Sequence, residues 1–118
     1  METIRLEFPM PLFSKARPRV TQYGVFMPKD YLDKRKQMIA LMQEQYTGEP
    51  IETPIRLDVE LFGEGRGDAD NIIGSLMDAG NKLLWADDRL GIISEISVAW
   101  TKTKKADSKW IVEITPLD

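Results

Sequence analysis

The sequence predicts an α+β fold: a single domain, residues 1–118, with a mixed β-sheet of about four main strands and two main helices. Three observations lead to this prediction. Four segments alternate apolar and polar residues as half-buried strands do, two segments have apolar residues at helical spacing, and the length of 118 residues suits one hydrophobic core. In chain order the segments give strand, small hairpin, helix, strand, helix, strand, strand.

The first half of the chain contains one strand, one hairpin and one helix. Residues 3–10, TIRLEFPM, alternate apolar and polar side chains and predict a half-buried strand that prolines end. Residues 16–28 have short β-prone pieces around Gly24, which predicts a loop with a small hairpin. Pro28 precedes a predicted helix over residues 30–46, which the following glycine and proline stop.

The second half contains the clearest strand and the more regular helix. Residues 54–63, PIRLDVELFG, alternate strictly and predict a strand that runs into an acidic loop. Residues 70–80 place their apolar side chains on one helical face and end at a glycine, and residues 81–88 predict a one-turn return segment. Residues 91–103 and 108–116 predict two final strands joined by a basic turn.

Composition excludes several classes of site. The chain has 42% hydrophobic and 30% charged residues, and no apolar run approaches the roughly 20 residues that span a bilayer. It has no cysteine and no histidine, so thiolate chemistry, Ser-His-Asp catalysis and histidine zinc sites are excluded. Carboxylate clusters without histidine favour hard cations, Mg²⁺ first and Mn²⁺ as the alternative. No secretory signal is visible, and we expect a cytoplasmic protein outside the membrane.

Charge is distributed unevenly along the chain. Residues 1–46 carry eight Lys and Arg against five acids, residues 47–95 carry four against eleven, and the remainder carries four against three. This layout suits basic arms that hold a phosphate backbone around an acidic, metal-neutralised pocket, although charge runs alone favour two solvated faces. The basic residues that the first interpretation assigns to DNA are Lys15, Arg17, Arg19, Lys29, Lys102, Lys104 and Lys105.

Four aspartates bracket the second helix. Asp68 and Asp70 follow a strand, where positions i and i+2 of an extended chain point to the same side. Asp87 and Asp88 come after the return segment, and the sequence leaves open whether they reach the same end of the sheet or the far end. We expect the acids to lie at one edge of the sheet, where divalent cations would offset their mutual repulsion.

Each aspartate also has an ordinary structural interpretation. Asp68 or Asp70 would cap the helix by accepting backbone N–H bonds, and Asp87 and Asp88 would be turn residues before the next strand. Taken singly, these roles are commoner than catalysis because aspartate is frequent at caps and turns.

The stretches ARPRVT, GVFMPKDYLDKRKQMI and GDADNIIGSLMDAGNKLLWADDRLGIISEISVAW together resemble the RusA family of Holliday junction resolvases, over roughly residues 15–114. The most specific part is the order D-x-D-N, helix, DA, short return, then DD before a strand. The resemblance implies a homodimer that binds four-way DNA junctions and makes symmetric, magnesium-dependent nicks. It implies catalytic roles for Asp68, Asp70 and Asp88, with Asp87 as a further metal ligand.

One position departs from the family pattern. The resemblance implies a lysine in the first turn of the helix, and here that place is Gly74. A cation near the attacked phosphate stabilises developing negative charge, so its loss affects cleavage more than binding. Four residues are candidates to replace it in space: Lys15, Arg17, Arg66 and Lys82.

Three functions follow as hypotheses. The favoured one is a metal-dependent, structure-selective endodeoxyribonuclease that resolves four-way junctions in recombination and repair. The alternatives are a junction-binding protein with weak or no cleavage because of Gly74, and a metal-dependent hydrolase of another phosphoester.

Overall fold

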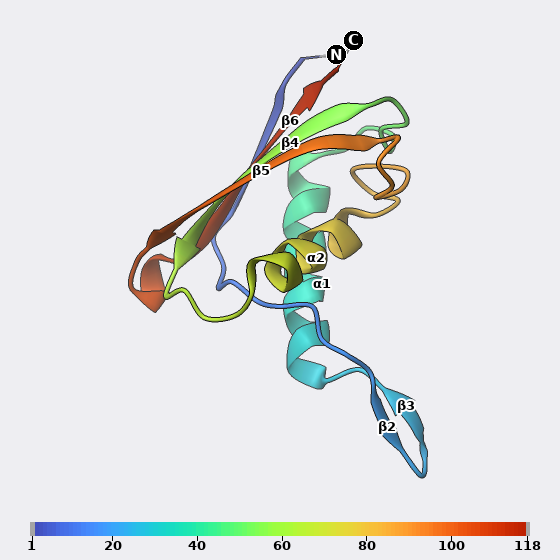
Figure 1. Ribbon diagram of the computed structural model, residues 1–118, viewed down its shortest axis with the longest axis vertical. Coiled ribbons are helices and arrows are strands. Elements are labelled where there is room, and N and C mark those ends of the chain that lie inside the picture. The colour runs from blue at the N-terminus through green and yellow to red at the C-terminus, as the bar shows by residue number, and fades with distance from the viewer. Residues whose placement is uncertain (1, 118) are drawn as a thin grey trace.

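Four strands form one mixed sheet in the order β1–β6–β4–β5, drawn in Figure 1. They are β1 (Ile4–Phe8), β4 (Ile55–Gly63), β5 (Ile93–Lys102) and β6 (Lys109–Pro116). The pairs β1–β6 and β6–β4 are antiparallel, whereas β4–β5 is parallel. The computed structural model describes residues 2–117, and it confirms the predicted α+β fold with a mixed sheet.

Two helices cover one face of this sheet: α1 (Lys29–Gln45) and α2 (Ala69–Gly80), which cross each other in Figure 1. The strict alternation of β4 explains the arrangement, because its apolar side chains Leu57, Val59 and Leu61 are all buried on the helix side. Two tryptophans in this core, one on β6 and one after α2, are fully buried. The predicted strand and helix segments are therefore all present.

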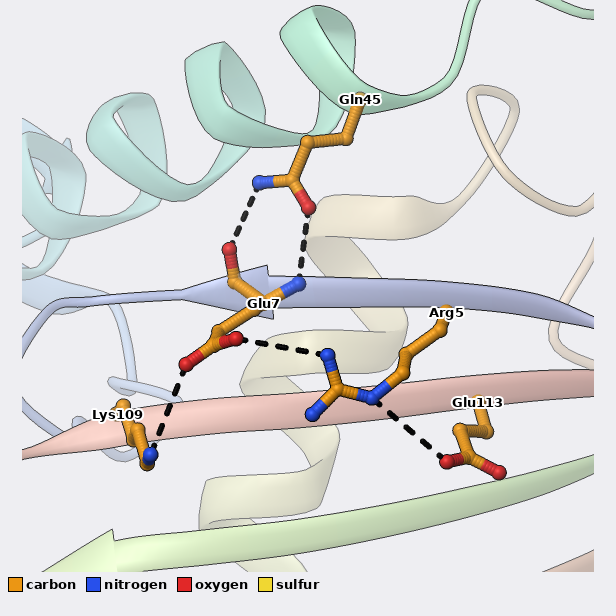
Figure 2. A network of polar contacts seen from close by, with 5 residues as sticks. All are labelled: Arg5, Glu7, Gln45, Lys109 and Glu113. Atoms are coloured by element: carbon orange, nitrogen blue, oxygen red, sulfur yellow. Dashed lines mark hydrogen bonds and ion pairs between the residues drawn. The ribbon is translucent and has the colours of Figure 1, made fainter.

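Helix α1 is fastened to the edge strand β1 by its last residue. The Gln45 side chain accepts a hydrogen bond from the Glu7 N–H at 2.8 Å and donates one to the Glu7 carbonyl at 2.7 Å (Figure 2). Arg5, Glu7, Lys109 and Glu113 form exposed ion pairs on the neighbouring strands in the same view. The Gln45 amide thus provides hydrogen-bond partners for the Glu7 N–H and carbonyl on the outer side of this edge strand.

Helix α2 connects the parallel strands β4 and β5, so it forms a βαβ unit. The chain leaves the carboxyl end of β4, turns back to begin α2 beside Leu61 and Val98, and then returns to the amino end of β5. The return is fixed by Trp85, whose indole N–H donates to the Met77 carbonyl at 3.2 Å and whose ring packs on Gly80. The Ala86 N–H also donates to the Ile51 carbonyl at 2.9 Å, just before β4.

A small hairpin stands apart from the sheet. Strands β2 (Arg19–Thr21) and β3 (Gly24–Phe26) form it, as predicted, and Gly24, the first residue after the two-residue turn, has a φ of 130°. Every residue of both strands is exposed, and Figure 1 shows the hairpin projecting beyond the start of α1. The predicted basic turn between β5 and β6 contains one turn of 3-10 helix, η1 (Lys105–Asp107). None of the helices within residues 2–117 is long and apolar enough to cross a membrane.

Candidate functional site

The first pair of acids lies where β4 passes into α2. Glycines at positions 65 and 67 have φ values of 87° and 95°, which turn the chain sharply toward the helix. Asp68 is the N-cap residue in extended conformation, yet its side chain forms no capping hydrogen bond with any described residue. Among the described residues, the Asp70 carboxylate accepts one hydrogen bond, a local one from the Asn71 N–H at 2.9 Å. Both aspartates are exposed, so their oxygens remain available for a ligand.

The second pair of acids lies on the return segment before β5. Asp87 accepts a hydrogen bond from the Asp88 N–H at 2.8 Å, and its other oxygen lies 3.9 Å from the Arg89 guanidinium. Asp88 is exposed. Asp87 is therefore held by local contacts, whereas the Asp88 side chain is left accessible.

The expectation that all four acids meet at one edge of the sheet is wrong for a single chain. The loop to Asp68 and Asp70 leaves the carboxyl end of β4, whereas the segment with Asp87 and Asp88 leads to the amino ends of β4 and β5. Strand β4 has nine residues, so these two ends are about 26 Å apart. Within residues 2–117, no group of three or more acidic side chains is close enough to hold a metal ion.

The separation follows from the connection between the strands. A helix that joins two parallel strands must run back along them, so residues before and after it lie at opposite ends of the sheet. One acid pair precedes α2 and the other follows it, so the two pairs lie apart in space.

Basic residues gather around the loop that leads from β4 to the first pair of acids. Arg66, Lys102 and Lys104 line a shallow groove together with Glu64, at the carboxyl ends of the parallel strands. An adjoining hollow is lined by Lys34 and Lys105, among others. The predicted DNA-binding residues Lys102, Lys104 and Lys105 thus lie at the end of the sheet where the loop to Asp68 begins. Sequence reasoning did not assign Arg66 or Lys34 to DNA, and the position of Arg66 two residues before Asp68 was the available signal.

The remaining predicted DNA-binding residues lie around the hairpin and the start of the helices. Lys15 pairs with Asp78 of α2 at 3.2 Å, and Lys29 pairs with Asp33 at 3.9 Å. Arg17 and Arg19 form no ion pair with any residue from 2 to 117. The segment 8–29 holds four basic residues and no acid, so it presents only positive charge.

An apolar surface lies next to the first pair of acids. Strand β5 is an edge strand: within the described part of the chain it pairs with β4 alone. Its side chains Ile96, Val98 and Trp100 face the helix side, because they are aligned with the buried residues of β4, yet they are 46%, 40% and 50% exposed. The Trp100 indole donates to the Gly63 carbonyl at 3.3 Å, which fixes the ring over the loop that leads to Asp68.

Burial affects one titratable group close to α2. The Tyr31 hydroxyl, on α1, has its pKa raised by burial and by the nearby Asp78 carboxylate, against a smaller lowering by Arg35 and Lys15. Tyr31 is therefore a neutral hydroxyl at neutral pH and does not add negative charge beside α2.

A comparison with protein families shows a match over residues 9–115 to the family model described as Endodeoxyribonuclease RusA. The matched range contains all four aspartates and every basic residue that the sequence assigns to DNA. A comparison with curated proteins finds no match.

Proposed function

Because the chain belongs to the RusA family of endodeoxyribonucleases, we propose that it resolves four-way DNA junctions by nicking two opposed strands with a divalent cation. The observation that carries this proposal is the arrangement at the carboxyl ends of β4 and β5. There, a groove lined by Arg66, Lys102 and Lys104 lies beside the loop that leads from β4 to two exposed carboxylates, Asp68 and Asp70, at the head of α2. Positive charge beside uncommitted carboxylates suits a phosphodiester substrate. A cytoplasmic location is part of the proposal.

We propose that a second copy of the chain completes the acidic site. Asp68 and Asp70 alone supply two carboxylates, and Asp87 and Asp88 of the same chain are at the far end of β4. A two-fold axis beside the middle of β5 reverses the strand direction, so the amino end of one β5 lies at the carboxyl end of the other. That operation brings the second copy's Asp88 to the Asp68–Asp70 end.

The edge of the sheet supports this arrangement. The outer edge of β5 pairs with no strand within residues 2–117, and Ile96, Val98 and Trp100 add exposed apolar surface beside it. Exposed apolar surface along an unpaired edge strand is typical of an interface. A homodimer also suits the substrate, because two related sites can cut the two opposed strands of a junction.

The donor atoms fit the proposed cation. Carboxylate oxygens are the ligands that Mg²⁺ favours, with Mn²⁺ as the alternative, and the Asp68 carboxylate has no competing capping bond among the described residues. A bound divalent cation supplies electrostatic stabilisation of the charge that develops on the phosphate during hydrolysis. Arg66, Lys102 and Lys104 hold the DNA backbone alongside, and Asp68, Asp70 and Asp88 hold the cation.

Nicking of a synthetic four-way junction tests the activity. We expect nicking with magnesium and none in EDTA, little cleavage of a linear duplex, and loss of nicking in Asp70→Asn and in Asp88→Asn. The control Glu44→Gln removes an exposed carboxylate from α1 and should leave the rate unchanged. Binding without nicking in the parent protein would instead support the junction-binding alternative.

A mixing experiment tests the shared site. When Asp70→Asn and Asp88→Asn proteins exchange subunits, each mixed dimer has one site with both substitutions and one site with neither, if the acids come from different copies. Mixing should then restore nicking of one strand per junction. If the acids came from one chain, every site would carry a substitution and mixing would restore nothing.

A further inference from the structure

Lys15 is fixed by the fold against the first turns of α2. Its N–H donates to the Asn71 carbonyl at 2.8 Å. Two residues earlier, the Phe13 carbonyl accepts a hydrogen bond of 2.9 Å from the buried hydroxyl of Ser75. The backbone of this segment is therefore joined to α2 at two points, and the position of the Lys15 α-carbon is determined.

The Lys15 side chain lies across Gly74. A β-carbon built on Gly74 would be 3.6 Å from Lys15 Cδ and 3.8 Å from Lys15 Cβ, which is ordinary contact. Positions 70, 74 and 78 are spaced four apart and share one face of α2. Lys15 thus occupies the middle of a face that carries Asp70 one turn before Gly74 and Asp78 one turn after it.

The present partner of Lys15 is a weak one. Its ammonium nitrogen lies 3.2 Å from Asp78 Oδ2, and the two side chains are 49% and 28% exposed. Ion pairs of this exposure contribute little to stability, so the ammonium group can leave Asp78 at small cost. From the same α-carbon the flexible side chain can turn toward the Asp70 end of the helix.

The other candidate cations are placed less well for that role. Lys82 lies beyond the last residue of α2, at the end of the helix opposite Asp70. Arg17 precedes the projecting hairpin, and Arg66 lines the groove that holds the DNA backbone. Lys15 is the candidate that backbone hydrogen bonds hold over the first half of the helix.

We propose that Lys15 is a catalytic residue that supplies the positive charge beside the phosphate attacked at the Asp68–Asp70 site, in the space that a side chain at position 74 would fill. This inference rests on the proposed function. In the hydrolysis a water oxygen bonds to phosphorus, one ester P–O bond breaks, and the leaving oxygen gains a proton while the water loses one. Lys15 remains protonated and donates hydrogen bonds to a non-bridging oxygen, where charge accumulates.

Moving the charge tests the proposal. Single-turnover nicking of a four-way junction, at saturating protein and fixed magnesium, should be about 100-fold slower in Lys15→Ala. Adding Gly74→Lys to Lys15→Ala should recover most of that loss, because the new side chain starts from the space that Lys15 occupied. Lys36→Ala, which removes an exposed lysine of α1, should nick at the parent rate. Asp78→Asn should nick at least as fast as the parent.

Three outcomes would overturn the proposal: parent-like nicking by Lys15→Ala, no recovery on adding Gly74→Lys to a double variant with the parent's thermal unfolding, or a strong loss in Asp78→Asn. The last would mean that the ion pair, not the free ammonium, is required.

A binding readout separates this inference from the proposed function. Reductive methylation of the parent protein in EDTA, with and without junction DNA, should show Lys15 protected by the DNA and Lys36 modified equally in both. Equal modification of Lys15 while the junction is bound overturns the role of Lys15 and leaves the proposed function standing. A parent protein that neither binds nor nicks the junction overturns both.

Discussion

Gly80→Ala should destabilise the protein because of a contact that only the folded chain makes. A β-carbon on Gly80 would be 2.5 Å from Trp85 Cζ2 and 3.0 Å from two further ring atoms. The indole is fully buried and its N–H is bonded to the Met77 carbonyl, so the ring has no space to withdraw. Overpacking of this kind costs about 1–3 kcal/mol.

The helix itself offsets part of this cost. Replacing glycine by alanine inside a helix stabilises the folded protein by about 1 kcal/mol. The gain at Gly80 should be smaller because it is the last residue of α2. We therefore expect a net loss of about 1–2 kcal/mol in the free energy of unfolding. For a domain of this length each kcal/mol lowers Tm by about 4 °C.

Gly74→Ala is the matched control on the same helix. Its β-carbon would meet only Lys15, at 3.6 Å, and the position is in the helix interior. The substitution should raise stability by about 0.5–1 kcal/mol. Urea unfolding followed by circular dichroism measures both variants, and Gly80→Ala should also slow junction nicking because Trp85 orients the segment that carries Asp88. Equal stability of Gly80→Ala and the parent would refute rigid packing of Trp85 on Gly80.

Three further predictions follow from particular contacts. Gln45→Leu removes both hydrogen bonds to the Glu7 backbone and should lower the free energy of unfolding in urea by about 1–2 kcal/mol. Gln43→Leu, at an exposed position of the same helix, should lower it by less than about 0.5 kcal/mol. Val98→Lys places a charge on the apolar edge of β5, so sedimentation should show a monomer and nicking should be lost, while a stable dimer would contradict the proposed interface. The raised pKa of Tyr31 means that the unfolded chain loses this proton first, so stability should fall as pH rises above 10.0, and a Tyr31→Phe variant should show a smaller fall.

Several correct predictions depended on local patterns. The alternation in residues 54–63 predicts β4 because period-two burial needs only one apolar face, and the apolar stripe of residues 70–80 predicts α2 in the same way. The place of the D-x-D pair between β4 and α2 was predictable because the strand before it and the helix after it each have their own periodicity. The extended conformation expected for both acids holds for Asp68 alone, since Asp70 lies in the first turn of α2. Gly24 between two β-prone pieces predicts the hairpin because glycine readily adopts a positive φ, and its φ in the structure is 130°.

The prediction that Asp68 and Asp70 meet Asp88 is wrong within one chain. The pattern of strand and helix segments does not contain the information that decides it. Whether two strands pair in parallel depends on contacts between distant parts of the chain, and the parallel pairing of β4 with β5 sends the return segment to the far end. The metal and catalytic roles of these aspartates stay predictions that the mixing experiment addresses.

The sequence by itself determined the strand and helix segments, the acidic turn at the head of α2 and membership of a nuclease family, because each is encoded in neighbouring residues. Only the tertiary structure decided that Lys15 lies over Gly74, that Trp85 packs on Gly80, and that β5 is an unpaired edge with exposed apolar side chains. These features are contacts, or missing contacts, between segments far apart in the chain. They depend on how the whole sheet and both helices pack, which no local periodicity specifies.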